Sequence, residues 1–281
     1  MSTVTATAPP FLPGTETGPR RLVRDGLLVA QRNLRHVLRV PELLIQATIQ
    51  PVMFVLLFAF VFGGSIDMPG GGSYRAYLLA GIFTQIVAFG SANTAMGIAE
   101  DLSKGVVDRF RSLPMARSAL LLGRAASHLV MNALALLVLA LSGLVVGWRA
   151  EEGVARTLAA FGVLLFFGFA MSWVGALTGI WLGRPEVVQA ATMTWLFPLT
   201  FLSNAFVPTQ GMPSWLRPVA EWNPVSATAA ACRELFGNPN PFAREGLFPA
   251  EHPVLTSLAW SALVIAIAAP LAVRRYRRAA G

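Results

Sequence analysis

The chain has 281 residues, of which 55% are hydrophobic and 13% are charged, and its formal net charge is +8. A soluble domain carries about twice that share of charged residues, so this composition excludes a soluble globular protein. The basic excess does not indicate nucleic-acid binding, because most basic residues adjoin long apolar segments, where Lys and Arg set membrane topology and meet anionic lipid.

The N-terminal part divides into a tail and an amphipathic segment. Residues 1–19 are rich in Thr, Pro and Gly and lack the apolar stretch of a cleavable signal peptide, so we interpret them as a disordered cytoplasmic tail. Residues 20–40 place apolar side chains on one helical face and arginines on the other, which predicts a helix lying in the membrane interface. Its polar face would hold Arg24, Arg32, Arg35 and Arg39 against the headgroup phosphates. A solvated helix packed on a partner protein is the alternative.

Six later segments are apolar enough and long enough to cross the hydrocarbon core as helices. These predicted spans cover residues 43–62, 74–99, 118–147, 157–182, 186–206 and 254–273. The fold class is therefore an all-α membrane protein, with residues 20–281 forming one transmembrane domain.

Several spans carry polar side chains. An unpaired polar group in hydrocarbon costs a few kcal/mol, so such side chains face protein or water. The candidates for a polar path through the membrane are Gln46, Gln50, Gln85, Asn93, Gln189 and Asn204. The competing interpretation is that each one only joins neighbouring helices by a hydrogen bond.

The connection between the second and third spans, residues 100–117, reads EDLSKGVVDRFRSLPMAR. Leu102, Val106 and Phe110 recur at helical spacing among charged residues, which predicts a short amphipathic helix over residues 100–114. At the membrane surface, such a helix is suited to insert its apolar ridge into a groove on a soluble partner. A solvated loop helix is the alternative.

Residues 207–253 are too broken by proline to span the membrane. Short stretches bearing Trp215 and Trp222 are separated by prolines such as Pro218, which predicts an outer re-entrant segment followed by a loop. Placing both termini in the cytoplasm puts most of the 22 Lys and Arg residues on that side, as the positive-inside rule requires. We therefore expect a multi-pass plasma-membrane protein with cytoplasmic termini.

Catalytic and metal-binding patterns are missing from the sequence. The sole lysine, Lys104, is not part of a GxxxxGK[ST] phosphate-binding loop, HExxH and GxSxG are absent, and Cys232 is the only cysteine. No carboxylate lies near the middle of a predicted span, which leaves His128 as the one titrating candidate for a proton-coupled carrier. Because Arg124 lies one turn before His128, it either snorkels toward the interface, as we expect, or forms a buried functional pair with the histidine.

Four features of the sequence carry a family resemblance. The amphipathic N-terminal helix, the six spans, the loop EDLSKGVVDRFRSLPMARSALLLGR and the segment VPTQGMPSWLRPVAEWNPVSATAAACRELF together resemble the type-2 ABC transporter (ABC-2) permeases. The nearest group is the daunorubicin/doxorubicin-resistance type of drug-efflux permease, and the resemblance extends from Arg21 over nearly the whole chain. The Leu113-Pro114 and Asn223-Pro224 steps match positions typical of this group.

The resemblance implies roles for specific segments. Residues 20–40 would be a connecting helix, residues 100–114 the coupling helix that docks on a separate nucleotide-binding subunit, and residues 212–236, within the re-entrant segment, an outer gate. The implied coupling interface consists of Glu100, Asp101, Leu102, Lys104, Val106, Asp108, Arg109, Phe110 and Arg111. The implied outer gate includes Trp215, Trp222, Asn223 and Pro224. A functional unit would contain two permease chains, identical or related, and two ATPase subunits.

The expected function is export of a hydrophobic or amphiphilic compound, such as a drug or antibiotic, driven by ATP that a partner subunit hydrolyses. ATP and Mg²⁺ would bind that partner, and this chain would bind no cofactor and catalyse no reaction. Export of a lipid or lipid-linked glycan is an alternative within the family. A proton-coupled carrier and a membrane scaffold that moves no substrate are the alternatives from other classes.

Overall fold

The computed structural model describes residues 49, 52–57, 60–61, 73–104, 119–240 and 247–279. In these ranges every regular element is a helix, which confirms the all-helical fold class. From residue 73 onward the elements are α3 (Tyr74–Ser103), α5 (Ala119–Val145), α6 (Gly153–Leu182), α7 (Pro185–Phe201), η2 (Thr209–Gly211), α8 (Arg217–Glu221), α9 (Pro224–Phe236), α10 (Phe248–Glu251) and α11 (Pro253–Ala279). The predicted tail, the predicted helix over 20–40, most of the first span and residues 105–114 lie outside the described residues.

Four helices are long and apolar enough to cross a membrane, and they correspond to the second, third, fourth and sixth predicted spans. They are Tyr74–Ser103, Gly123–Val145, Gly153–Leu182 and Pro253–Tyr276. The first predicted span falls mostly outside the described residues, so the count of six spans stays a prediction.

The fifth predicted span, residues 186–206, is shorter in the structure. Helix α7 has 17 residues and contains Pro198, which has no N–H to bond to the preceding turn. The helix ends at Phe201, and the residues that follow, Ser203 and Asn204, favour local turns over helix. Asn204 therefore lies in the connection between α7 and α9 rather than inside a membrane helix.

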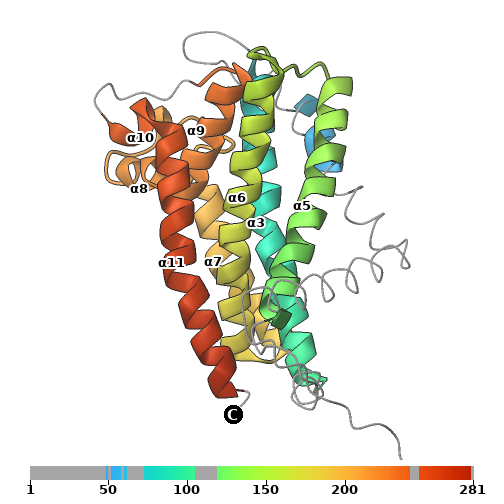
Figure 1. Cartoon of the computed structure of the whole chain (residues 1–281). Coiled ribbons are helices and arrows are strands. Elements are labelled where there is room, and N and C mark those ends of the chain that lie inside the picture. The colour runs from blue at the N-terminus through green and yellow to red at the C-terminus, as the bar shows by residue number, and fades with distance from the viewer. Residues whose placement is uncertain are drawn as a thin grey trace, which may run out of the picture.

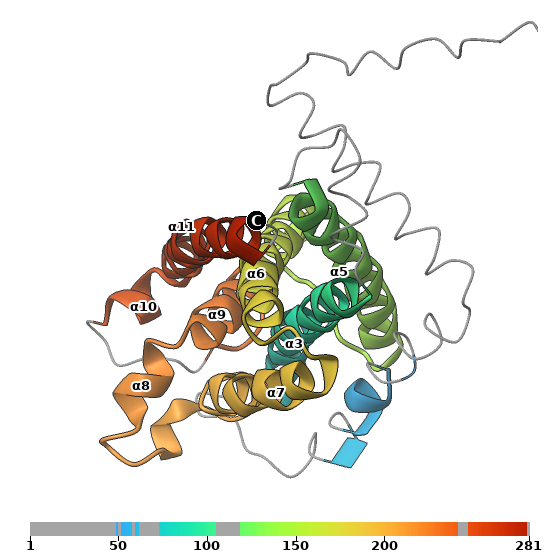
Figure 2. The same ribbon diagram turned by 90° about the horizontal axis from the view of Figure 1, so that it is seen from below.

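Helix α3 lies at the centre of the bundle. It packs against α5, α6, α7 and α9, while α11 packs on α6 and α9 from the other side. Viewed along the bundle, α3 is surrounded by these helices (Figure 2). Figure 1 shows that α3 ends, and α11 reaches the C terminus, at the same end of the molecule, which we call the lower end. Helices α8, α9 and α10 gather toward the opposite, upper end (Figure 1).

Small residues bring α3 and α6 into backbone contact. A Cβ atom added at Gly175 would lie 2.2 Å from the carbonyl oxygen of Ser91, and one added at Gly179 would lie 2.4 Å from that of Ala95. Gly175 and Gly179 are four residues apart and so share one face of α6. This is the small-xxx-small arrangement by which membrane helices approach closely and gain dispersion energy without a hydrophobic driving force.

Replacing Gly179 by alanine is expected to destabilise the fold by about 1–3 kcal/mol, because the added methyl group must push α6 away from α3. The matched control is Gly162→Ala on the same helix, where a Cβ would meet nothing within 4 Å. Alanine there should stabilise slightly, by about 0.5–1 kcal/mol at most, through its higher helix propensity. The check is the thermal unfolding midpoint of each purified variant in detergent. Equal midpoints for the two variants would show that the α3–α6 contact is not tight.

An aromatic cluster joins the upper ends of the helices. Phe83 of α3, Trp148 of the α5–α6 loop and Phe236 of α9 meet edge to face, with ring centroids 5.1 to 6.0 Å apart. The indole N–H of Trp148 donates to the side-chain oxygen of Asn238 at 2.7 Å, and the amide of Asn238 donates to the carbonyl oxygen of Arg149 at 3.1 Å. The C-terminal end of α9 is therefore held against the rest of the bundle.

Candidate functional site

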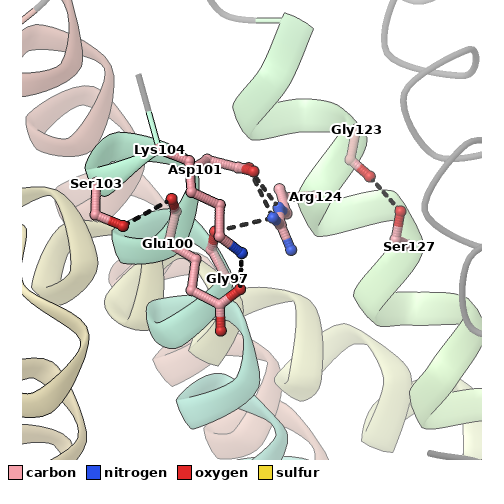
Figure 3. A network of polar contacts seen from close by, with 8 residues as sticks. All are labelled: Gly97, Glu100, Asp101, Ser103, Lys104, Gly123, Arg124 and Ser127. Atoms are coloured by element: carbon pink, nitrogen blue, oxygen red, sulfur yellow. Dashed lines mark hydrogen bonds and ion pairs between the residues drawn. The ribbon is translucent and has the colours of Figure 1, made fainter. Parts of the chain in front are cut away.

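An ion pair at the lower end joins α3 to α5 (Figure 3). Arg124, near the start of α5, donates from Nε and Nη2 to the same oxygen of Asp101, at 3.0 and 2.6 Å. Nη2 also donates to the carbonyl oxygen of Gly97 at 2.8 Å. Asp101 is 8% exposed, so this charge-assisted contact is largely shielded from water.

A glycine makes room for this contact. A Cβ at Gly97 would lie 2.2 Å from Nη1 of Arg124, so any larger residue at this position would displace the guanidinium. Gly97 precedes Asp101 by one helical turn, so the space and the carboxylate lie on the same face of α3. Gly97 and Asp101 together therefore leave a space on the surface of α3 into which the side chain of one arginine of α5 fits.

The predicted coupling helix, residues 100–114, begins inside α3 and continues into the connection between α3 and α5. Glu100, Asp101, Leu102 and Lys104 continue and end α3, four residues beyond the predicted end of the second span. Glu100 and Lys104 form an exposed ion pair at 3.1 Å, which contributes little to stability. Figure 3 shows this exposed pair beside the Asp101–Arg124 contact. The other predicted interface residues lie outside the described residues; they are Val106, Asp108, Arg109, Phe110 and Arg111.

Arg124 and His128 have different partners in the structure. The guanidinium of Arg124 pairs with Asp101 across the interface between α3 and α5 rather than with His128. That its stem also snorkels toward the membrane surface stays a prediction. His128 is buried and its Nε2 lies 2.9 Å from the amide nitrogen of Asn132. Since an amide nitrogen only donates, Nε2 is the acceptor in this contact.

The upper end holds a second polar cluster, centred on Arg233 of α9, which has no exposed surface. Its Nε donates to the carbonyl oxygen of Tyr77 at 3.0 Å, and Nη2 donates to those of Asn204 and Ala205 at 2.9 and 3.1 Å. The guanidinium carbon lies 3.5 Å from the centroid of the Tyr77 ring. Carbonyl dipoles and an aromatic face thus stabilise the buried charge. One side chain thereby connects α9, α3 and the segment after α7.

Asn223 provides a second link between α9 and α7. Its side-chain oxygen accepts from the backbone N–H of Val225 at 2.8 Å and so caps the N terminus of α9. Its amide nitrogen donates to the carbonyl oxygens of Leu199 and Leu202 at 2.7 and 2.8 Å, which the end of α7 leaves without helical partners. Pro224 follows at the first helical position, where its missing N–H costs nothing.

The predicted outer-gate residues fall into two groups. Asn223 is 7% exposed and forms part of the fold, next to Pro224. Trp215 and Trp222 are 74% and 48% exposed, and they flank the short helix α8 at the upper end. The tryptophans are therefore available to lipid, substrate or a second chain, whereas Asn223 is committed to packing.

The predicted path residues are not brought together in the described structure. Gln85 and Asn204 are buried, while Asn93 and Gln189 are exposed on α3 and α7. Both side-chain atoms of Asn204 lack a hydrogen-bond partner among the described residues, although its backbone carbonyl accepts from Arg233 and Tyr77. Gln46 and Gln50 lie outside the described residues.

Arg233 was not among the candidate site residues predicted from the sequence. The available signal was the composition of α9, PVSATAAACRELF, in which small residues precede the single arginine on every face. Such a helix can be covered on all sides, and a cation inside it must find acceptors within the protein. Glu221 of α8 was missed in the same way; it is 4% exposed, and its Oε2 has no partner in the described ranges.

The sequence of this chain is similar to those of known membrane transport proteins. Residues 26–236 match the family model described as "ABC-2 type transporter". The chain is 35% identical to the daunorubicin resistance ABC transporter permease protein DrrB1 of Streptomyces coeruleorubidus, covering 84% of this chain and 80% of that protein. It is 27% identical to the probable doxorubicin resistance ABC transporter permease protein DrrC of Mycobacterium tuberculosis, covering 97% and 95%. It is 24% identical to the putative transport permease ycf38 of Porphyra purpurea, covering 77% and 75%.

Proposed function

Because this chain belongs to the ABC-2 type transporter family, we propose that it is the transmembrane subunit of an exporter that moves hydrophobic or amphiphilic drugs or antibiotics out of the cell. The observation that carries the proposal is the similarity over residues 26–236, together with that to the resistance permease of S. coeruleorubidus. The long apolar helices support a multi-pass membrane protein. Family membership implies a partner ATPase subunit, and in our proposal two such subunits bind ATP and Mg²⁺ while two permease chains enclose the path.

The lower end supports the proposed place of the ATPase. In this proposal residues 100–114 dock on the partner, and the Asp101–Arg124 ion pair holds the two helices from which this segment leaves and to which it returns. A force applied to the segment would then reach α3 and α5 together rather than bending the loop alone. We place this end, with the C terminus, in the cytoplasm.

Helix α3 connects the lower and upper polar contacts and can transmit movement between the two ends of the bundle. It runs without interruption from Tyr77, which accepts from Arg233, to Asp101, which accepts from Arg124. At a rise of about 1.5 Å per residue, these two contacts are about 36 Å apart along the axis. We infer that movement of the coupling segment shifts α3 as a rigid element and so changes the position of the outer segment that carries Trp215 and Trp222.

The alternatives make different demands on the structure. A lipid or lipid-linked glycan would suit the same family and the same coupling, so only transport assays with each substrate class separate it from drug export. A proton-coupled carrier would use His128, whose Nε2 accepts from Asn132 in the described structure. A scaffold would bind the partner without moving substrate.

The experiment that tests the proposal uses the full chain together with its partner ATPase subunit. We expect the chain alone to hydrolyse no ATP, and the pair to co-purify and to export a fluorescent anthracycline from ATP-loaded vesicles. Phe110→Asp should reduce the ATPase retained per permease about fivefold, corresponding to about 1 kcal/mol of lost apolar contact. Phe248→Asp, at a half-exposed upper-end position, is the control and should retain the partner fully. Anthracycline transport by the chain alone under a proton gradient would instead establish the carrier.

A further inference from the structure

A pocket of about 370 Å³ opens where the last turns of α6 and α11 meet. It is lined by Ile180, Trp181, Arg275 and Arg278. Both helices reach the lower end of the bundle, close to the C terminus (Figure 1). Trp181 and Ile180 belong to the last turn of a helix that is long enough to cross a membrane, so we expect the pocket at the level of the lipid headgroups.

Packing around Tyr276 fixes the geometry of this pocket. Tyr276 is 3% exposed and belongs to a buried cluster with Trp173 and Ile180 of α6. Arg275 and Arg278 lie on either side of it in sequence, three residues apart, and so share one face of α11. The buried tyrosine therefore holds both exposed arginines over the end of α6.

The two arginines have no neutralising partner in the described part of the chain, where neither forms a hydrogen bond or an ion pair. Their position in the last turn of α11 is favourable on its own, because the C-terminal end of a helix dipole attracts cations. The helix dipole accounts for the two charges, but not for the pocket between α6 and α11 or for Trp181 beside it, which is 68% exposed. An indole prefers the headgroup level of a bilayer, and two guanidinium groups present planar sets of donors that match phosphate oxygens.

We propose that this pocket binds the phosphate of an anionic phospholipid, with Arg275 and Arg278 donating to the phosphate oxygens and Trp181 lying against the glycerol and upper acyl chains. The proposal commits to a lipid rather than a soluble anion because the site combines a basic face with an exposed indole at the end of a membrane helix. It is independent of the partner ATPase and of the exported compound.

The test measures lipid binding to the purified full-length chain. Delipidated protein is titrated with phosphatidylglycerol or phosphatidylcholine, and bound lipids are counted by native mass spectrometry. We expect the phosphatidylglycerol affinity of R275Q/R278Q to fall about thirtyfold, because the double variant removes two basic residues that each contribute about 1 kcal/mol near an anionic surface. Phosphatidylcholine binding should not change. R274Q removes a charge from the same turn at an exposed residue that does not line the pocket, and it should bind like the unmodified chain.

Two further measurements complete the test. One distinguishes a bound lipid from a free anion, and the other distinguishes the contribution of charge from that of the indole contact. Trp181→Ala should also lower the phosphatidylglycerol affinity, although it leaves the charge unchanged. Millimolar inorganic phosphate should not displace the lipid. The proposal is overturned if R275Q/R278Q keeps its preference for phosphatidylglycerol, if R274Q loses as much affinity as the double variant, or if inorganic phosphate displaces the lipid completely.

Discussion

Replacing Arg233 by methionine is expected to destabilise the purified chain by about 3 kcal/mol, because buried carbonyl oxygens lose their donor. Methionine has nearly the length of the arginine stem and fills irregular space well, so the change removes hydrogen bonds rather than volume. The oxygen of Asn204 keeps the hydroxyl of Tyr77 as a donor, but that of Ala205 loses the Nη2 contact, and the stack on the Tyr77 ring is lost as well. The connection between α9, α3 and the segment after α7 is thereby broken.

The measurement is the unfolding midpoint of each variant, followed by tryptophan fluorescence in detergent. Arg233→Lys should fall between the unmodified chain and Arg233→Met, because an ammonium keeps the charge but lacks the planar set of donors that reaches three carbonyls. Arg156→Met is the matched control, since Arg156 is exposed and, among the described residues, pairs with Glu152 at the N-cap of its own helix. It should change stability by less than about 1 kcal/mol. Unfolding of Arg233→Met at the midpoint of this control would contradict the assigned role.

Loss of the Asp101–Arg124 ion pair is expected to reduce ATP-driven export about tenfold or more, because hydrogen bonds to charged groups contribute about 1.5–3 kcal/mol and about 1.4 kcal/mol is a factor of ten. Asp101→Ala leaves the guanidinium of Arg124 half-buried without its carboxylate, and Arg124→Ala leaves the carboxylate without a donor. In either variant the coupling segment would move without carrying α3 and α5 together. ATP hydrolysis by the bound partner should continue, now with little export.

A double-mutant cycle separates the direct interaction between Asp101 and Arg124 from the loss of stability that each substitution causes by itself. The two single variants and the double variant should show a coupling energy of about 2 kcal/mol for Asp101 and Arg124. The same cycle on Glu100 and Lys104, an exposed pair in the same turns of α3, should give only about 0.3–0.5 kcal/mol. Additive effects at Asp101 and Arg124, or export that persists in both single variants, would show that the ion pair does not transmit movement.

The described spans could be predicted closely from the sequence because membrane helices need length and apolarity, and both are visible residue by residue. The segment predicted at 157–182 is the helix Gly153–Leu182, and that predicted at 74–99 is Tyr74–Ser103. The later end of α3 has a local cause, since residues 100–103 contain neither glycine nor proline. The early end of α7 depends on how Ser203 and Asn204 bond in the folded chain, which hydropathy does not express.

Contacts between distant residues could not be predicted in this way. Asp101 and Arg124 are 23 positions apart, and only the close approach of α3 and α5 at Gly97 brings them together. Arg233 bonds to a carbonyl 156 positions earlier in the chain. Charge counting treats such residues as markers of the nearer membrane surface, so it cannot identify one that serves as an internal hydrogen-bond donor.

The buried contacts of Arg233 also have a consequence for biogenesis. Its three acceptor carbonyls, in Tyr77, Asn204 and Ala205, all precede it in the chain. Because synthesis proceeds from the N terminus, every acceptor has been made before the donor leaves the ribosome. The arginine can therefore enter a site that already exists, and its arrival completes an assembly begun by segments made long before it. Nascent chains that stop short of Arg233 should accordingly leave the upper ends of α3 and α7 open to proteolysis.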